Sequence, residues 1–216
     1  NADWDVWDAG IAMCRKYKIY FTGGMVTGWN IGKEASVIGD IQGGYFDAAS
    51  HSWDHYYGTM TAEVQVRDSH DRIVTVFGNY LPCDPYCLVY IQPYGRTTFR
   101  ESLSQYGYLA ERSIGGSMLN WNSGYGIYLD GPTYELTDTD TRDSVFDSAY
   151  SSFGTYLIYG HPSRPGRGKG PLQFISGSTV EQHFQHISMR NDVWYSPLNG
   201  YYMYAYARMT AIQKTH

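Results

Sequence analysis

The sequence predicts a mainly β protein, an antiparallel β-sandwich or barrel-like domain with two or three short peripheral helices. Several segments alternate apolar and polar side chains with a period of two, which is the pattern of half-buried strands. The chain of 216 residues contains 22 tyrosines and 24 glycines, a mixture typical of short strands joined by many turns. Because 43% of the residues are hydrophobic and no linker or internal repeat interrupts them, one domain over residues 1–216 is expected.

The alternating segments are the candidate strands of the β-rich body, residues 16–216. They lie at 16–21, 61–66, 72–81, 87–92, 124–130, 154–160 and 198–212. The last, "LNGYYMYAYARMTAI", places Tyr202, Tyr204 and Tyr206 on one face of a strand and Ala and Met on the other. The polar residues 68–71 read as the connection of a hairpin between two β-branched runs.

Helical periodicity occurs in three places. Trp4, Trp7, Ile11 and Cys14 form one stripe, which predicts a short helix over residues 3–15 and makes Cys14 a buried thiol of the core. Residues 178–181 have capping-box spacing ahead of an amphipathic run, and residues 141–153 show a third helical stripe.

Charge and composition exclude some classes of function. A net charge of −5 and a pI of about 5.7 oppose binding to nucleic acid. No apolar run is long enough to predict a membrane span. A start at "NADW" without Met, and a disulfide predicted between Cys83 and Cys87, indicate a secreted or cell-surface protein. The lack of an Asn-x-Ser/Thr sequon fits a bacterial or phage source.

Aromatic residues next to Asn, Asp and Gly suggest recognition of a ligand. Rings offer flat apolar faces and the polar neighbours offer hydrogen bonds, which together suit a sugar. The sequence therefore predicts a lectin-like, glycan-binding adhesin or receptor-binding module whose partner is a glycan or a cell-surface receptor. The predicted ligand-binding residues are Trp53, Asp54, Tyr56, Tyr57, Asn120, Trp121, Asn122, Tyr125 and Trp194.

The segment "HSWDH" is the densest candidate for a metal site. His51 and His55 are four residues apart and share a face on a helix or on a strand, and Asp54 offers an oxygen ligand. The competing interpretation is a pair of ordinary surface histidines, so no cofactor is expected, with Zn or Ca as the alternative. His183 and His186, in "HFQH", form a second pair to which the same two interpretations apply.

Two alternative functions stay open. A secreted hydrolase or toxin domain would use the His51, Asp54 and His55 group, or the carboxylates of Asp130 and Glu135. The acidic run around these carboxylates suits either calcium or a solvated face. An oligomerising structural subunit of a capsid, pilus or coat would use the tyrosine face of residues 198–212 as its interface. No P-loop, dinucleotide fingerprint or nucleophile elbow occurs, and a binding protein is preferred over an enzyme.

Overall fold

The computed structural model describes residues 4–55, 60–81, 86–95, 98–112, 133–136, 142–161 and 173–213. The chain divides into two compact units, each described by itself. Unit 1 comprises residues 1–21 and 131–195, and unit 2 comprises residues 22–130 and 196–216. The expectation of one domain over residues 1–216 stays a prediction.

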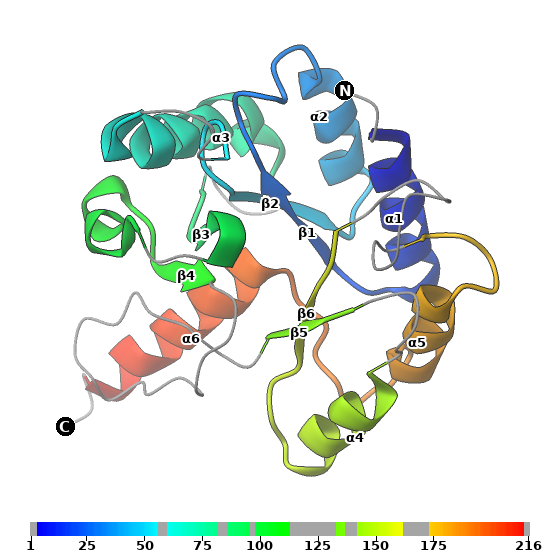
Figure 1. The fold of residues 1–216 in the computed structure, drawn as a ribbon. Coiled ribbons are helices and arrows are strands. Elements are labelled where there is room, and N and C mark those ends of the chain that lie inside the picture. The colour runs from blue at the N-terminus through cyan, green and yellow to red at the C-terminus, as the bar shows by residue number, and fades with distance from the viewer. Residues whose placement is uncertain are drawn as a thin grey trace. The chain divides into compact units, whose positions relative to one another are not determined.

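Unit 2 is built on a parallel sheet, so the predicted antiparallel sandwich is wrong. Its four strands stand in the order β1-β2-β3-β4 (Figure 1). They are β1 (Phe21–Met25, whose first residue belongs to unit 1), β2 (Phe46–Ser50), β3 (Val89–Ile91) and β4 (Ala110–Arg112). The pairs β2–β3 and β3–β4 are parallel. At the carboxyl ends of β1 and β2, the N–H of His51 donates to the carbonyl of Met25 and the N–H of Thr27 donates to the carbonyl of Ser52. Both chain segments therefore run in the same direction here as well.

Helices occupy three ranges that alternation assigned to strands. Residues 61–66 overlap a π-helical turn, η1 (Glu63–Asp68), and residues 72–81 fall in α3 (Ser69–Phe77) and a 3-10 turn, η2 (Gly78–Tyr80). No hairpin forms at 68–71, because η1 continues directly into α3. Within α3, Ile73 and Phe77 are buried one helical turn apart, so the stripe that packs is the helical one.

The tyrosine-rich C-terminal segment is the helix α6 (Leu198–Gln213) instead of a strand. Leu198, Tyr201 and Tyr202 pack on the sheet at i, i+3 and i+4, whereas Tyr204 and Tyr206 are exposed. The period-two alternation of this segment suggests a strand, but its Ala and Met residues have high helix propensity. Burial of one helical face against the sheet favours the helix. The remaining elements of unit 2 are α2 (Glu34–Gln42), η3 (Pro93–Gly95), η4 (Arg100–Ser102) and η5 (Ser104–Tyr106).

Both faces of the sheet are covered, as a parallel sheet requires. All five residues of β2 are buried. Ala49 belongs to an apolar cluster with Tyr202 of α6, and on the other face the Ser50 hydroxyl lies 2.7 Å from that of Ser69 on α3. Figure 1 shows α3 and α6 on opposite sides of these strands.

Asn199, fully buried in the first turn of α6, ties the amino ends of two strands together. Its Oδ1 accepts from the backbone N–H groups of Leu88 (3.0 Å) and Val89 (3.1 Å). Its Nδ2 donates to Asp47 Oδ2 (2.9 Å) and to the carbonyl of Ala48 (2.8 Å). All of these hydrogen bonds end on β2 or at the start of β3, so Asn199 attaches the helix to both strands.

Burial raises the pKa of Asp47 from 3.8 to about 6, although Asn199 and the N–H of Ala48 partly stabilise its charge. The unfolded chain therefore loses this proton at lower pH than the folded chain, and stability falls as pH rises from about 4 to about 6. Two pKa units correspond to roughly 3 kcal/mol. Urea unfolding at a series of pH values should show this decline, and Asp47→Asn should remove it. Equal slopes for both proteins would contradict this assignment.

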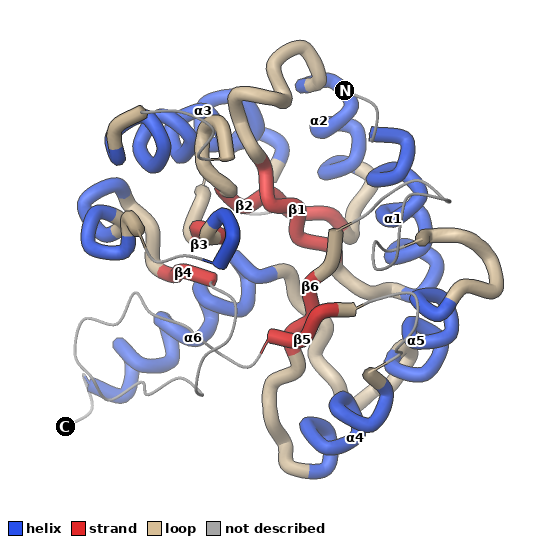
Figure 2. The backbone as a smooth tube through the Cα atoms, in the orientation of Figure 1, coloured by secondary structure: helices blue, strands red, loops and turns tan. Residues whose placement is uncertain are grey.

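Unit 1 packs helices around a two-stranded parallel sheet, which Figure 2 draws in red among blue helices. Its elements are α1 (Trp4–Tyr17), β5 (Thr133–Glu135), α4 (Asp143–Ser151), β6 (Leu157–Tyr159) and α5 (Thr179–Ile187). The helix expected over residues 3–15 corresponds to α1, and the stripes at 141–153 and 178–187 are confirmed as α4 and α5. The core of unit 1 includes Met13, Cys14, Phe146, Val180 and Phe184.

The start of α5 confirms Ser178 as the N-cap of the predicted capping box, while Glu181 reaches back to the N–H of Gly177 rather than to that of Ser178. The Ser178 hydroxyl accepts from the N–H of Glu181 at 3.2 Å. The Glu181 carboxylate accepts from Lys16 Nζ (2.6 Å), the Tyr17 hydroxyl (2.9 Å) and the N–H of Gly177 (2.6 Å). Led by Lys16, these donors lower the pKa of Glu181 to about 2. The carboxylate therefore stays charged and holds α1 against α5.

The predicted disulfide is wrong, because Cys87 is a free, buried thiol. Burial raises the pKa of Cys87 well above its usual value and that of Cys14 to about 12, so both are protonated and unreactive near neutral pH. Cys14 is the buried core thiol that its helical stripe predicts. None of the helices within the described ranges has the length and apolar character to cross a bilayer.

Candidate functional site

The carboxyl edge of the parallel sheet in unit 2 gathers the candidate functional residues. His51 follows directly after β2, Tyr94 follows β3, and Trp29 lies in the loop after β1. In open α/β sheets, ligands bind outside the carboxyl ends of the strands, where side chains from separate loops converge. The position of "HSWDH" at this edge makes it a candidate active site.

The two histidines are close enough to share one ion. Their ring centres are 4.8 Å apart and both side chains are half-buried. A zinc ion bound at ~2.1 Å to each imidazole would place the ring centres roughly 5 Å apart, so the spacing fits. His51 Nδ1 donates to the carbonyl of Ile91 at 2.7 Å, which leaves Nε2 as the nitrogen with a lone pair. A hydrogen bond from the second nitrogen to a carbonyl is the usual support of a metal-binding imidazole.

The pair supplies two ligands, and a catalytic zinc site in a protein usually has three. Within the described ranges, no group of three His, Cys, Asp or Glu side chains is placed to hold a metal ion. Asp54, the predicted oxygen ligand, accepts instead a hydrogen bond from Gln65 Nε2. Two imidazole nitrogens suit zinc or a similar transition metal and do not suit calcium, which prefers oxygen ligands.

The turn that carries the histidines has a strained backbone. Ser52 (φ 70°) and His55 (φ 62°) adopt left-handed conformations, as does Tyr94 (φ 57°) on the neighbouring loop. Such conformations are costly for residues other than glycine and concentrate at functional sites. Ser52 contributes to the turn, because its hydroxyl accepts from the N–H of His55 at 2.9 Å.

Aromatic rings flank His55. The centre of the Tyr94 ring lies 4.6 Å and that of the Trp29 ring 5.8 Å from the centre of the His55 ring. Trp29 is 54% exposed and Tyr94 is 51% exposed, so both offer apolar surface beside the imidazoles. Gly28 allows the loop after β1 to lie against the turn that carries the histidines, because a Cβ at residue 28 would lie 2.6 Å from the carbonyl oxygen of Trp53.

A buried cation stands in the same row of the sheet. Ser50 pairs with Tyr90, so His51 is level with Ile91, and Ile91 pairs with Arg112. Arg112 is 8% exposed. Adjacent strands are ~4.8 Å apart, so the backbone of Arg112 lies roughly 10 Å from that of His51. Arg112 thus occupies the third position of this row, two strands from His51.

The structure places the other predicted ligand-binding residues as follows. Trp53 lies in the same turn as the histidines, while Trp194 is an exposed residue of unit 1. Six of them, Tyr56, Tyr57, Asn120, Trp121, Asn122 and Tyr125, lie outside the described residues, as does Asp130. Sequence reasoning missed Trp29, Gln65 and Tyr94. For Trp29 and Tyr94 the signal was a position just after the carboxyl end of a parallel strand, which the antiparallel assignment hid. Gln65 lies in η1 and had no such signal.

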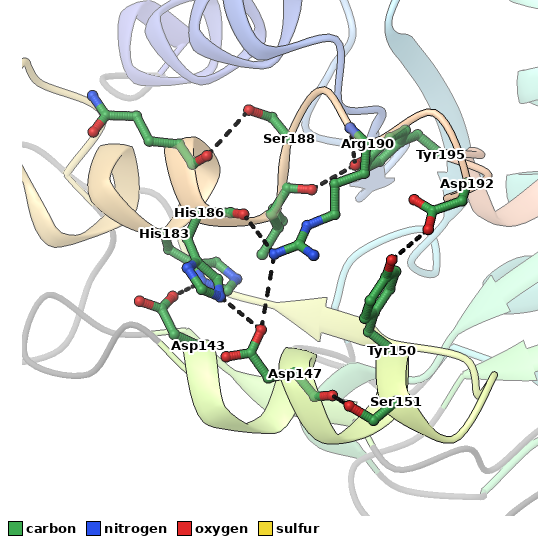
Figure 3. Close-up of polar contacts among 12 residues, drawn as sticks. Asp143, Asp147, Tyr150, Ser151, His183, His186, Ser188, Arg190, Asp192 and Tyr195 are labelled. Atoms are coloured by element: carbon green, nitrogen blue, oxygen red, sulfur yellow. Dashed lines mark hydrogen bonds and ion pairs between the residues drawn. The ribbon is translucent and has the colours of Figure 1, made fainter.

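The second histidine pair has a structural role in unit 1. Figure 3 shows two aspartates of α4 pointing at two histidines of α5. Asp143 Oδ1 lies 2.6 Å from Nδ1 of the buried His183, and Asp147 Oδ1 lies 2.8 Å from Nε2 of His186. The Nε2 of His183 lies 3.0 Å from the Tyr156 hydroxyl. Both ring nitrogens of His183 are thus engaged, and these contacts join the two helices.

Comparisons with known proteins support the α/β assignment. No family model matches the chain, and no curated protein matches its sequence. Among solved structures it is similar to PuuE allantoinase, with 14% identity and a TM-score of 0.66 over 94% of this chain and 72% of that one. It is also similar to a putative polysaccharide deacetylase from Mycobacterium smegmatis, with 11% identity and a TM-score of 0.59 over 94% of this chain and 78% of that one.

A further match, to a polysaccharide deacetylase from Bacillus cereus, has 12% identity and a TM-score of 0.42 over 51% of this chain. It covers 36% of that chain, so the similar region is about a third of its length. At these identities the likeness to the allantoinase and the mycobacterial protein concerns the fold, and it overturns the β-sandwich.

Proposed function

We propose that this chain is a hydrolase whose site is the His51–His55 pair at the carboxyl edge of the parallel sheet. The observation that carries the proposal is the placement of two imidazoles at the spacing of a shared ion, with His51 oriented by the Ile91 carbonyl. This replaces the lectin-like adhesin predicted from composition, because the solved structures with a similar fold are named as enzymes, a putative polysaccharide deacetylase and an allantoinase. The alternative hydrolase hypothesis, centred on the same histidines, is the one supported.

A bound zinc ion would supply an activated water and a Lewis acid for a carbonyl group. The residues of this chain would hold and orient the reactants. His51 and His55 would bind the ion through one nitrogen each. The half-exposed rings of Trp29 and Tyr94 would contact the apolar surface of the substrate and exclude water from one side.

The substrate class is suggested by the names of the structural neighbours. One is a putative polysaccharide deacetylase and another an allantoinase, so an acetylated polysaccharide is the first substrate to test. In this proposal the glycan predicted from the sequence is a substrate rather than a receptor. A polysaccharide substrate agrees with a secreted or cell-surface location, which stays a prediction.

Metal removal tests the proposed function. The full chain is treated with a chelator, dialysed, and assayed for acetate release from an acetylated polysaccharide with and without added Zn²⁺. We expect the metal-free protein to be inactive and stoichiometric Zn²⁺ to restore hydrolysis, because the bound ion is the proposed source of the activated water. Hydrolysis that persists through chelation would contradict a metal-dependent mechanism. A zinc-loaded protein inactive on acetylated polysaccharides would contradict the proposed substrate class.

A further inference from the structure

Gln65 directs its whole side-chain amide at the turn that carries the histidines. It is fully buried, and its Oε1 accepts from the backbone N–H groups of Trp53 (3.2 Å) and Asp54 (3.3 Å). Its Nε2 donates to the Asp54 carboxylate. One buried amide thus holds two successive peptide groups and one side chain of the turn between Ser52 and His55.

This turn needs external support. Ser52 and His55, at its two ends, have left-handed backbone conformations that cost free energy for residues with a Cβ. Strained residues persist where the surrounding structure fixes them. The Ser52 hydroxyl fixes the N–H of His55, and the residues between them are fixed by Gln65.

The π-helical turn η1 presents Gln65. Within η1, Gln65 and Val66 are the buried residues, while Glu63 and Arg67 form an exposed ion pair on its other side. A π turn takes more residues per turn than an α-helix and shifts the direction of the side chains that it carries, and such turns occur frequently at functional sites. The carbonyl of Val66 accepts a hydrogen bond from the buried Tyr108 hydroxyl at 3.0 Å, and this bond fixes the position of η1.

We propose that Gln65 is a positioning residue for the His51–His55 pair. It sets the path of residues 52–55 and so the place of the His55 imidazole relative to that of His51. This inference rests on the proposed function, because it assigns the pair to a shared metal ion. Gln65 contacts neither the ion nor the substrate and acts through the backbone of the turn.

An exchange of donor and acceptor tests this role. Gln65→Glu keeps the two acceptor contacts but loses the donor and places a second carboxylate against Asp54. We expect the affinity for Zn²⁺ to fall ~10–100-fold, the range for loss of an outer-shell partner. In the double variant Asp54→Asn with Gln65→Glu, the Asn amide donates to the new carboxylate, and the affinity should return to within ~3-fold of wild type, as expected when coupled partners are exchanged together.

The measurement is competition for Zn²⁺ against a chromophoric chelator with the purified full chain, together with the absorption spectrum of the Co²⁺-loaded protein. A changed Co²⁺ spectrum in Gln65→Glu and its recovery in the double variant would show repositioned ligands, which a loss of stability alone would not produce. If Gln65→Glu does not fold, Gln65→Met takes its place, since it removes the hydrogen bonds without adding charge, and the same loss of affinity is expected.

The outcomes separate the two proposals. If the wild-type chain binds no Zn²⁺, the proposed function fails. If the wild type binds Zn²⁺ and the folded Gln65 variants bind it equally well with the same Co²⁺ spectrum, the positioning role is overturned and the proposed function stands. Failure of the double variant to recover affinity would also overturn the positioning role.

Discussion

Replacing His51 or His55 with Ala should abolish hydrolysis. Each variant removes one of the two imidazoles that the proposed function assigns to a shared ion. Loss of an outer-shell partner already costs ~10–100-fold in metal affinity or activity, and loss of a ligand itself should exceed that range. Initial rates of acetate release, measured at equal total Zn²⁺, check this expectation.

His70→Ala is the matched control for these variants. His70 lies in the same unit but contacts Asp71 and the ring of Tyr108 instead of the site histidines. We expect the control to keep its activity as long as it is folded, which its circular dichroism establishes. A His51 variant as active as the His70 variant would exclude the pair from catalysis.

Asn199→Ala should cause the largest loss of stability. It leaves the N–H groups of Leu88 and Val89, the carbonyl of Ala48 and the carboxylate of Asp47 without this buried partner. An unsatisfied buried group costs ~1–3 kcal/mol, so a loss on the order of 4 kcal/mol is expected after partial relaxation. Since small domains are stable by only ~5–15 kcal/mol, this is a large fraction of the total.

Met203→Ala on the same helix serves as the comparison for this variant. Met203 is among the exposed residues of α6, so its removal should change the free energy of unfolding by no more than ~0.5 kcal/mol. Urea denaturation followed by circular dichroism measures both variants. Similar midpoints for Asn199→Ala and Met203→Ala would show that the hydrogen bonds of Asn199 to the two strands do not stabilise the fold.

Local signals predicted local structure. The Ser178 cap and the helical stripe after it predicted α5, because a capping box and its first turn lie within a few residues. The spacing of His51 and His55 singled out the candidate site for the same reason. Both features could be recognised from neighbouring residues alone.

Features that depend on distant segments could not be predicted. In α6, Tyr, Ala and Met alternate with a period of two, and only contact of Tyr201 and Tyr202 with the sheet selects the helical face. The β-branched residues of 72–77 suggest a strand, yet burial of Ile73 and Phe77 makes them one side of a helix. Gln65 contacts the histidine turn from η1, eleven residues further along the chain than Asp54, and no pattern in the sequence around it signals that contact.

Calorimetric titration of the metal-free full chain with Zn²⁺, run in parallel on a variant with both His51→Ala and His55→Ala, tests the central claim most directly. We predict saturable binding of one zinc ion per wild-type chain and no such binding by the double variant. Equal binding by the two proteins, or none by the wild type, would contradict the assignment of the carboxyl edge of the parallel sheet as a metal-dependent active site.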